Sequence, residues 1–346
     1  MHATLAPSFY KCQVALSLAK VDPSSAGTGG RKRAAAQVSG ASVVIEVAWL
    51  YYREGLNQKE IAERLSLSRA TVVNHLAEAR TRGLIRIDLD PSAFAGHAAA
   101  VALTRRFGLA AAHVIPDEGQ EEVGTFRRTV QGAAAWLPDL LRPGDRVGLA
   151  WGRTIYDLAT TLEPTRLPDL TVLQLVGSMA TPYGFSAEAC SSLLAERLHA
   201  TCANLHAPAV LSSDALAASL RAEPIIAAQL AGAEGCNKLL FSVGTCQTDS
   251  HVVRSGLATE DELAWYVARG AAAVLCGRFI DVAGRWVEGP IDARMIGVTP
   301  DYLIGLDMGI CVTPGLDKVE ATRAAIAGGY VTHLIAPLSV AQALLA

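Results

Sequence analysis

Long apolar runs and paired cysteines are both missing from this sequence. No stretch of about 18 uninterrupted apolar residues occurs, so we expect no membrane-spanning helix. The N-terminal segment is a poor signal peptide, because it lacks a basic start and Lys11 and Lys20 interrupt its apolar residues. The seven cysteines include no Cys-Xaa-Xaa-Cys pair, which argues against a disulfide framework and a zinc site. We therefore expect a cytoplasmic protein with reduced thiols, no metal and no cofactor.

Aromatic residues are also scarce, at 6% of the 346 residues, while alanine occurs 60 times. This composition indicates helix-rich packing with small side chains. Hydrophobic residues make up 51% of the chain, which is enough for a large core and excludes global disorder. A chain of this length is typical of about two domains.

The net charge of −3 argues against a nucleic-acid-binding protein if it is taken over the whole chain. The charge is unevenly distributed, however. Residues 1–90 contain 12 Lys and Arg against 8 Asp and Glu, a net charge of +4. The remainder contains 18 against 25, a net charge of −7. A basic first quarter attached to an acidic body predicts two functions in two parts of the chain.

Three segments are predicted from the composition. Residues 1–41 are expected to be a disordered tail, because residues 23–30 have the composition of a linker. Residues 42–90 are predicted to be a helical unit. Residues 91–346 are predicted to be an α/β domain. The basic triplet at 31–33 is either a solvated charge run, which we favour, or an arm that touches DNA phosphates.

The strongest local pattern is a helix-turn-helix at residues 58–77. Val72 and Leu76 repeat at the helical spacing and face the first short helix. Ser68 is a good N-cap for the second helix, because its hydroxyl can accept from a free N–H of the first turn. These are the features of a DNA-binding motif whose second helix enters the major groove.

Flanking elements complete the predicted unit. A preceding helix at 43–54 supplies the third wall of an all-α core, and the alternating residues 84–89 predict a wing strand. The sequence thus predicts a winged helix-turn-helix that binds double-stranded operator DNA. The alternative is a structural helical pair with ordinary surface charges.

The outer face of the second helix carries the residues expected to reach base edges. These residues are Arg69, Ala70, Thr71, Asn74 and His75. Ser68, at the start of the same helix, is counted with the DNA-contacting residues. Basic residues around the helix are expected to contact phosphates, namely Lys59, Arg64, Arg80 and Arg86. For any single residue, the pattern does not decide whether the residue contacts a base. A phosphate contact, or no contact at all, is about equally consistent with it.

From about residue 110 onward, short β-branched runs alternate with helical stretches, which favours a parallel sheet covered by helices. The runs lie at residues 112–115, 146–150, 171–176, 202–206, 238–243, 274–280, 309–313 and 331–335. Helical stretches lie at residues 97–107, 154–162, 187–200, 259–269 and 317–327.

Several of these segments resemble the SorC-type transcriptional regulators in the family's order. The segments are Trp49 to Leu65, Ser68 to Val72, Arg82 to Ile87, Gly148 to Thr154, Leu173 to Gly177, Leu205 to Ala209, Gly270 to Ala272, Cys276 to Asp281 and the segment around Lys318. The resemblance covers residues 42–346. It implies a bacterial regulator with a Rossmann-like α/β domain, similar to the ribose-phosphate isomerase and glucosamine-phosphate deaminase fold. It also implies a sugar, polyol or sugar-phosphate effector and a homo-oligomer, a dimer or a tetramer.

Four positions depart from the family's pattern. Ser66 stands where the turn usually has glycine, and His75 where an apolar residue is usual. Val274 and Pro337 stand where the family usually has acidic residues. The loss of two acids implies an atypical effector.

The loops that follow the predicted strands are the expected effector site, because ligands of open α/β sheets bind beyond the carboxyl ends of the strands. The loop 151–154 is the best candidate, since its glycine and the free N–H groups of a helix start favour an anion. The expected effector residues are Trp151, Gly152, Arg153, Thr154, Gly177, Ser178, Gly244, Thr245 and Lys318. The alternative is that these glycines only make tight turns. Arg278 and Asp281 are expected to form a structural ion pair rather than a site.

Three functions are compatible with this organisation. The first is a regulator of carbohydrate metabolism controlled by an effector. The second is a phosphosugar isomerase or deaminase with a fused DNA module, which would need a carboxylate base. Val274 and Pro337 cannot transfer protons, so we expect no catalytic residue and no enzyme. The third is a constitutive DNA-binding protein whose body only forms oligomers.

Overall fold

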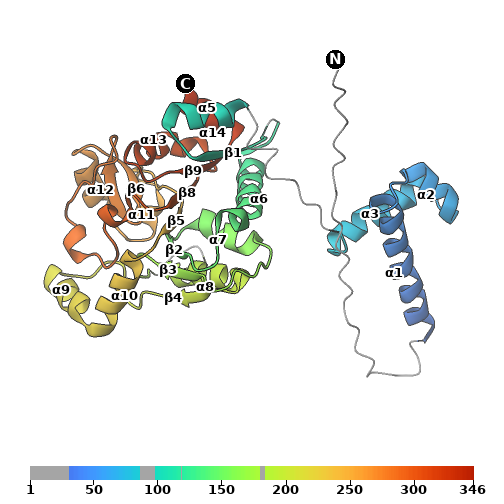
Figure 1. Ribbon diagram of the computed structural model, residues 1–346, viewed down its shortest axis with the longest axis horizontal. Helices are drawn as coiled ribbons and strands as arrows, with labels where there is room; N and C mark the ends of the chain where they lie inside the picture. The colour runs from blue at the N-terminus through green and yellow to red at the C-terminus, as the bar shows by residue number, and fades with distance from the viewer. Residues whose placement is uncertain (1–30, 86–97, 118, 180–183) are drawn as a thin grey trace, which may run out of the picture. The chain divides into compact units, whose positions relative to one another are not determined.

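The computed structural model describes residues 31–85, 98–117, 119–179 and 184–346, with the backbone alone described over 31–41 (Figure 1). The chain divides into two compact units, Met1–Leu89 and Asp90–Ala346. No helix within the described ranges is long and apolar enough to cross a membrane.

Three helices form the N-terminal unit. They are α1 (Arg31–Tyr52), α2 (Gln58–Leu65) and α3 (Arg69–Thr81). Their shared core contains Leu50 of α1, Ile61 of α2 and Leu76 of α3, each almost fully buried. The helix-turn-helix predicted at residues 58–77 is therefore confirmed, with the preceding helix as its third wall.

The first helix begins earlier than expected. The predicted tail ended at residue 41 and the predicted helix began at residue 43, whereas α1 begins at Arg31. Residues 31–37 are Arg-Lys-Arg-Ala-Ala-Ala-Gln, which are all good helix formers, so the helix extends into the predicted tail. Residues 1–30 lie outside the described residues.

The predicted wing at residues 84–89 is described only in its first two residues, and neither is in a strand. Ile85 is buried against Val44, Ala48 and Ala79 in a second small core. The rest of the predicted wing, including Arg86, lies outside the described residues.

A seven-stranded sheet with the order β1-β9-β8-β5-β2-β3-β4 forms the centre of the second unit, and every neighbouring pair is parallel. The strands are β1 (Ala111–Ile115), β2 (Arg146–Leu149), β3 (Thr171–Gln174), β4 (Thr201–Ala203), β5 (Lys238–Phe241), β8 (Met308–Val312) and β9 (His333–Pro337). The predicted parallel sheet is confirmed, and each strand overlaps a predicted run.

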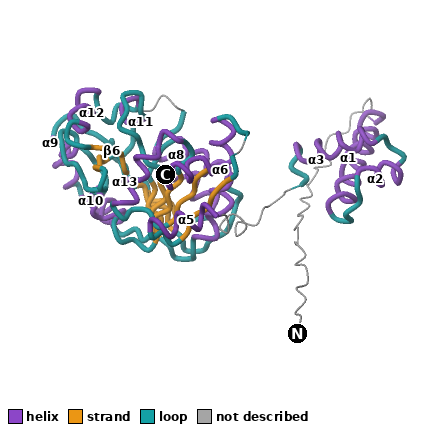
Figure 2. Tube along the Cα trace, turned by 90° about the horizontal axis from the view of Figure 1, so that it is seen from above, coloured by secondary structure: helices purple, strands orange, loops and turns teal. Residues whose placement is uncertain are grey.

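Helices cover both faces of this sheet, and Figure 2 shows the strands enclosed between them. On one face lie α6 (Glu122–Leu140), α7 (Arg153–Thr161) and α8 (Ala187–Leu198); on the other lie α5 (Ala98–Phe107), α13 (Val319–Ala327) and α14 (Leu338–Leu345). The remaining helices are α9 (Asp214–Ala222), α10 (Pro224–Glu234), α11 (His251–Arg254) and α12 (Glu260–Val267), with 3-10 turns at Asp292–Arg294, Pro300–Leu303 and Leu316–Lys318.

Leu239 and Phe241 of β5 point to one core and Leu240 to the other, and all three are fully buried. A strand buried on both faces explains the continuous apolar runs.

One predicted strand is wrong. Residues 274–280 do not join the parallel sheet but belong to a separate antiparallel pair, β6 (Ala271–Leu275) and β7 (Arg278–Asp281). Cys276 and Gly277 make the turn between them with φ of +48° and +80°. Two positive φ values are the geometry of a tight hairpin turn. Cysteine is not a usual turn residue, so the apolar run gave no sign of the reversal.

A buried ion pair holds this hairpin, and it differs from the predicted pair. The Arg278 guanidinium lies 2.7 Å from the Asp292 carboxylate, with both side chains almost fully buried. Asp292 also accepts a hydrogen bond from the Tyr266 hydroxyl at 2.5 Å. Asp281 pairs instead with Arg285 at 2.8 Å. The hairpin is therefore attached to the rest of the unit through Asp292.

We predict that Asp292→Asn destabilises the second unit by about 3–5 kcal/mol, because it leaves the Arg278 cation buried without its counter-charge. Urea unfolding followed by tryptophan fluorescence measures the effect. The control is Glu320→Gln, which removes an ion pair between a carboxylate that is 82% exposed and the partly buried Arg323 at 3.4 Å, and it should change the free energy of unfolding by less than about 1 kcal/mol. Equal effects of the two substitutions would contradict the assigned role of Asp292.

Candidate functional site

The turn between α2 and α3 is built by local hydrogen bonds. Asn57 and Glu60 form a capping box at the start of α2, with Glu60 N donating to Asn57 Oδ1 at 3.1 Å and Asn57 N to Glu60 Oε2 at 2.7 Å. Ser66 takes the left-handed backbone, with φ of +55°, at the position where the family usually has glycine. The Ser68 hydroxyl accepts from Thr71 N at 3.0 Å, which confirms the predicted N-cap.

The exposed face of α3 carries Arg69, Ala70 and Asn74, as the sequence predicts. Val73 lies on the same face and is 43% exposed. From the sequence, Val73 was not assigned to the exposed face. The adjacent Val72 was already placed on the buried face, and nothing in the sequence indicates that an apolar residue is exposed. An exposed apolar side chain on such a face is of the kind that contacts a thymine methyl group.

Two other residues that are predicted to reach base edges are less exposed. Thr71 is partly buried and contacts the Ser68 hydroxyl at 2.8 Å. The His75 side chain is only 22% exposed and lies 3.5 Å from Glu78. It therefore lies at the side of the exposed face rather than at its centre.

The described residues that are predicted to contact phosphates are all exposed cations. Arg80 is in the last turn of α3. Lys59 lies 3.9 Å from Glu63, and Arg64 lies 3.0 Å from Glu54, so nearby carboxylates offset part of their charge.

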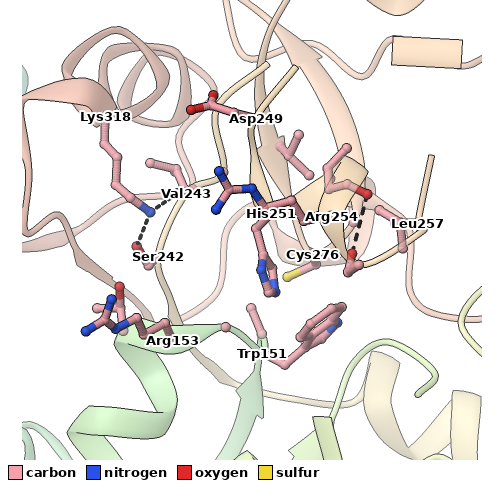
Figure 3. A pocket seen from close by; sticks show the side chains of 18 of the residues that line it. Trp151, Arg153, Ser242, Val243, Asp249, His251, Arg254, Leu257, Cys276 and Lys318 are labelled. Carbon is pink, nitrogen blue, oxygen red and sulfur yellow. Dashed lines mark hydrogen bonds between the residues drawn. The ribbon is translucent and has the colours of Figure 1, made fainter. Parts of the chain in front are cut away.

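In the second unit, the strand order reverses between β2 and β5. From β2 the chain adds β3 and β4 on one side, and it then returns to place β5, β8 and β9 on the other. Loops leaving β2 and β5 therefore diverge and leave a crevice at the carboxyl ends of the strands, where ligands of such sheets bind. A cavity of about 340 Å³ lies there (Figure 3).

Most of the predicted effector residues line this cavity. They are Trp151, Gly152, Arg153, Thr154, Gly244 and Lys318. Gly177, Ser178 and Thr245 are not among the lining residues. Gly177 is required for packing, because a Cβ there would lie 2.6 Å from the Pro208 carbonyl oxygen. Ser178 N donates to the Ala207 carbonyl at 2.8 Å.

The start of α7 borders the cavity. Gly152 is its N-cap with φ of +151°, and no side chain caps the helix. Thr154 is buried in the first turn. Arg153 is exposed and lies 3.5 Å from Asp157 and over the Phe126 ring. The uncapped N–H groups of the first turn favour an anion at this edge.

Lys318 brings a partly buried ammonium group to the same edge (Figure 3). Its Nζ donates to the Val243 carbonyl at 2.8 Å and to the Ser242 hydroxyl at 3.2 Å. Within the described part of the unit, no carboxylate lies within 4.0 Å of this ammonium. Burial lowers the pKa of Lys318 below its usual value. The charge of Asp317 opposes this effect in part, and a bound anion would oppose it further.

The opposite wall contains residues that sequence reasoning did not assign to the site. His251 lies with its ring 4.8 Å from the Trp151 ring, and burial, with the charge of Lys318, lowers its pKa to about 4. Burial raises the pKa of the Cys276 thiol, so both groups are neutral at neutral pH. The other residues of this kind are Phe126, Ser242, Val243, Asp249, Arg254, Ser255 and Leu257. Except for Phe126 in α6, they lie in loops and in the four-residue α11, which have no periodic pattern.

Comparisons with known proteins show to which family the chain belongs. Residues 94–346 match the family described as "Putative sugar-binding domain". YjhU, an uncharacterized transcriptional regulator of Escherichia coli, is 36% identical over 308 residues, which cover 88% of this chain and 94% of YjhU. The chain belongs to the SorC-type family of sugar-binding transcriptional regulators.

Other regulators match this SorC-type chain over similar lengths. The deoxyribonucleoside regulator of Bacillus subtilis is 30% identical over 303 residues, 87% of this chain and 96% of that regulator. The crystal structure of the full-length sorbitol operon regulator SorC from Klebsiella pneumoniae has a TM-score of 0.74 at 22% identity, covering 88% of this chain and 99% of that structure. This structural likeness supports the predicted fold.

We predict that inorganic phosphate binds the SorC-type cavity with an affinity that falls as the pH rises from 8 to 10. An anion favours the charged form of Lys318, and its lowered pKa means that this form is lost at a lower pH than for an ordinary lysine. Calorimetric titration at several pH values measures the dependence. Lys318→Met should weaken binding by about tenfold or more and flatten the dependence.

Arg153→Met is the matched control for this prediction, because Arg153 is exposed and already paired with Asp157. It should weaken binding less than Lys318→Met. A pH dependence that persists unchanged in Lys318→Met would show that Lys318 is not the group responsible.

Proposed function

We propose that this SorC-type regulator controls genes of carbohydrate metabolism, and that a sugar, polyol or sugar phosphate in the β2–β5 cavity sets its affinity for operator DNA. The observation that carries this proposal is the partly buried Lys318 ammonium at the cavity edge, without a carboxylate within 4.0 Å in the described part of the unit. Together with the uncapped start of α7, it favours a phosphorylated effector over a neutral one. Names of relatives, which refer to deoxyribonucleosides and the sorbitol operon, are consistent with a sugar-derived ligand.

The N-terminal unit is the proposed DNA reader. Its α3 presents Arg69, Val73 and Asn74 on one exposed face, and these side chains suit guanine, the thymine methyl group and adenine. Lys59, Arg64 and Arg80 would contact phosphates, and phosphate contacts position the helix without reading sequence.

Control by the effector follows from differential affinity. The effector stabilises one arrangement of the oligomer, and that arrangement fits the operator better or worse than the alternative. A cytoplasmic dimer or tetramer would present two reader units to half-sites about one helical turn, or a multiple of it, apart.

Catalysis is not part of this proposal. An isomerase or deaminase needs a carboxylate base held against the sugar carbons. Among the described residues that line the cavity, the only carboxylate is Asp249, which is exposed, and Val274 lines the wall where the family usually has an acid. Aldose–ketose conversion above background by the purified chain would contradict this part of the proposal.

The whole proposal is tested with DNA selected by the full chain from random duplexes. Fluorescence anisotropy then measures binding of the selected duplex with and without pentose and hexose phosphates. We expect specific binding and a change in affinity of fivefold or more with at least one compound. Failure to select any sequence would contradict the reader function. Selection without any response would favour a constitutive DNA-binding protein.

We predict that Asn74→Ala relaxes the sequence preference at one position of each half-site, at a cost of about 1–3 kcal/mol against the preferred base. Arg80→Ala is the control, because loss of a phosphate contact should weaken all sequences alike and reduce the salt dependence of binding. Repeating the selection with each variant measures both effects. An unchanged preference in Asn74→Ala would reject the role of Asn74 as a base reader.

A further inference from the structure

The helix α1, drawn in blue in Figure 1, has one face that the fold leaves exposed. Its opposite face carries Val47 and Leu50, which are fully buried against α2 and α3. Between residues 42 and 53, the exposed residues recur at spacings of three, four and seven, which places them on one side of the helix. They are Ser42, Ile45, Glu46, Trp49 and Arg53, and together we call them the α1 face.

Two large apolar side chains form the centre of the α1 face. Ile45 is 36% exposed and Trp49 is 41% exposed, and they lie one helical turn apart. Adjacent apolar side chains of this size gain free energy when a partner removes them from water. The α1 face is therefore a candidate interaction surface.

One acidic and one basic residue flank this apolar centre. Glu46 lies three residues before Trp49 and Arg53 lies four residues after it, so the two charges are two helical turns apart on the same side. Arg53 follows the last residue of α1, but its N–H donates to the Trp49 carbonyl at 2.8 Å and so continues the helical turn. The neighbouring Glu54 pairs with Arg64 at 3.0 Å. Among the described residues, in contrast, neither Glu46 nor Arg53 has an opposite charge within 4.0 Å, so both are available to a partner.

This order of charges is complementary to itself. When two copies of α1 pack antiparallel about a two-fold axis beside Trp49, Glu46 of each copy faces Arg53 of the other and the apolar side chains meet near the axis. A parallel pair would place like charges next to each other, which is unfavourable. DNA is a less suitable partner, because Glu46 would repel its phosphates. The partner that fits the α1 face is a second copy of this chain.

We propose that the N-terminal units of two copies associate through the α1 face, with α1 antiparallel to α1 and the ion pair between Glu46 and Arg53 formed twice. This inference goes beyond the proposed function, which leaves open how two reader units are held together. A two-fold contact at α1 fixes the separation of the two α3 helices, and hence the spacing of the half-sites that the protein accepts.

Disulfide cross-linking of the full chain, without DNA or effector, tests the contact. The full chain is used because a contact of about three helical turns is small for an interface that forms on its own. Trp49→Cys places a thiol beside the proposed axis, close to the same thiol of the second copy. Under mild oxidation it should give more covalent dimer than Glu63→Cys, by about threefold or more, because a disulfide forms only between thiols that are held close together.

Glu63 is the matched position for this comparison, since its side chain is 68% exposed and it lies on α2, outside the α1 face. The chain without an added cysteine gives the background from the natural thiols.

Charge reversal in the Trp49→Cys chain tests the antiparallel arrangement. Glu46→Arg and Arg53→Glu should each lower the yield of covalent dimer by about threefold or more, because each places like charges at both contacts. The two reversals together should restore the yield to within about twofold, since they form the same pairs with the charges exchanged. Arg166→Glu is the control, because it makes the same change of charge at an exposed residue of the second unit, and the yield should be unchanged.

The outcomes are independent of the proposed function. Equal cross-linking of Trp49→Cys and Glu63→Cys would overturn the proposal, and another occupant would then cover the α1 face. A yield that withstands both single reversals, or that the combined reversal does not restore, would overturn the antiparallel pair. Neither result involves operator or effector, whereas failure to select any DNA sequence would contradict the reader function and leave this contact untouched.

Discussion

The reversal of strand order between β2 and β5 is the constraint on which the site depends. Parallel strands point their carboxyl ends the same way, so a reversal separates two neighbouring loops and opens a crevice between them. Lys318 reaches this crevice from the turn that follows β8, and the N-terminus of α7 reaches it from β2. Because the sheet is buried on both faces, the positions of these groups are fixed by the packing of the core rather than by the loops alone.

Much of the architecture could be predicted from sequence because its signals are local. Helical spacing, the Ser68 cap and the apolar runs determine the helix-turn-helix and the parallel strands, and these agree with the structure. The hairpin of β6 and β7 could not be predicted, since its turn uses Cys276 in a left-handed conformation within an apolar run. The partner of Arg278 was missed for a related reason: Asp292 is distant in sequence, whereas the predicted partner Asp281 was close.

Prediction of the cavity was most successful where a loop directly follows a strand. Trp151 to Thr154 and Gly244 follow β2 and β5 and line the cavity. Gly177 and Ser178 also follow a strand, but they pack against the segment at Ala207 and Pro208 instead. A glycine after a strand can serve either ligand binding or close packing, so sequence alone does not distinguish the two roles. The residues on the opposite side of the cavity, such as His251 and Cys276, form no sequence motif, and only the fold brings them together.

The proposed function requires that anion binding in this cavity is coupled to DNA binding at α3. Thermodynamic linkage requires the coupling to be reciprocal. The most direct test titrates the tightest-binding sugar phosphate into the full chain, first alone and then with saturating selected duplex. We expect DNA to change the ligand affinity by the same factor by which the ligand changes the DNA affinity. An unchanged ligand affinity would contradict the coupling.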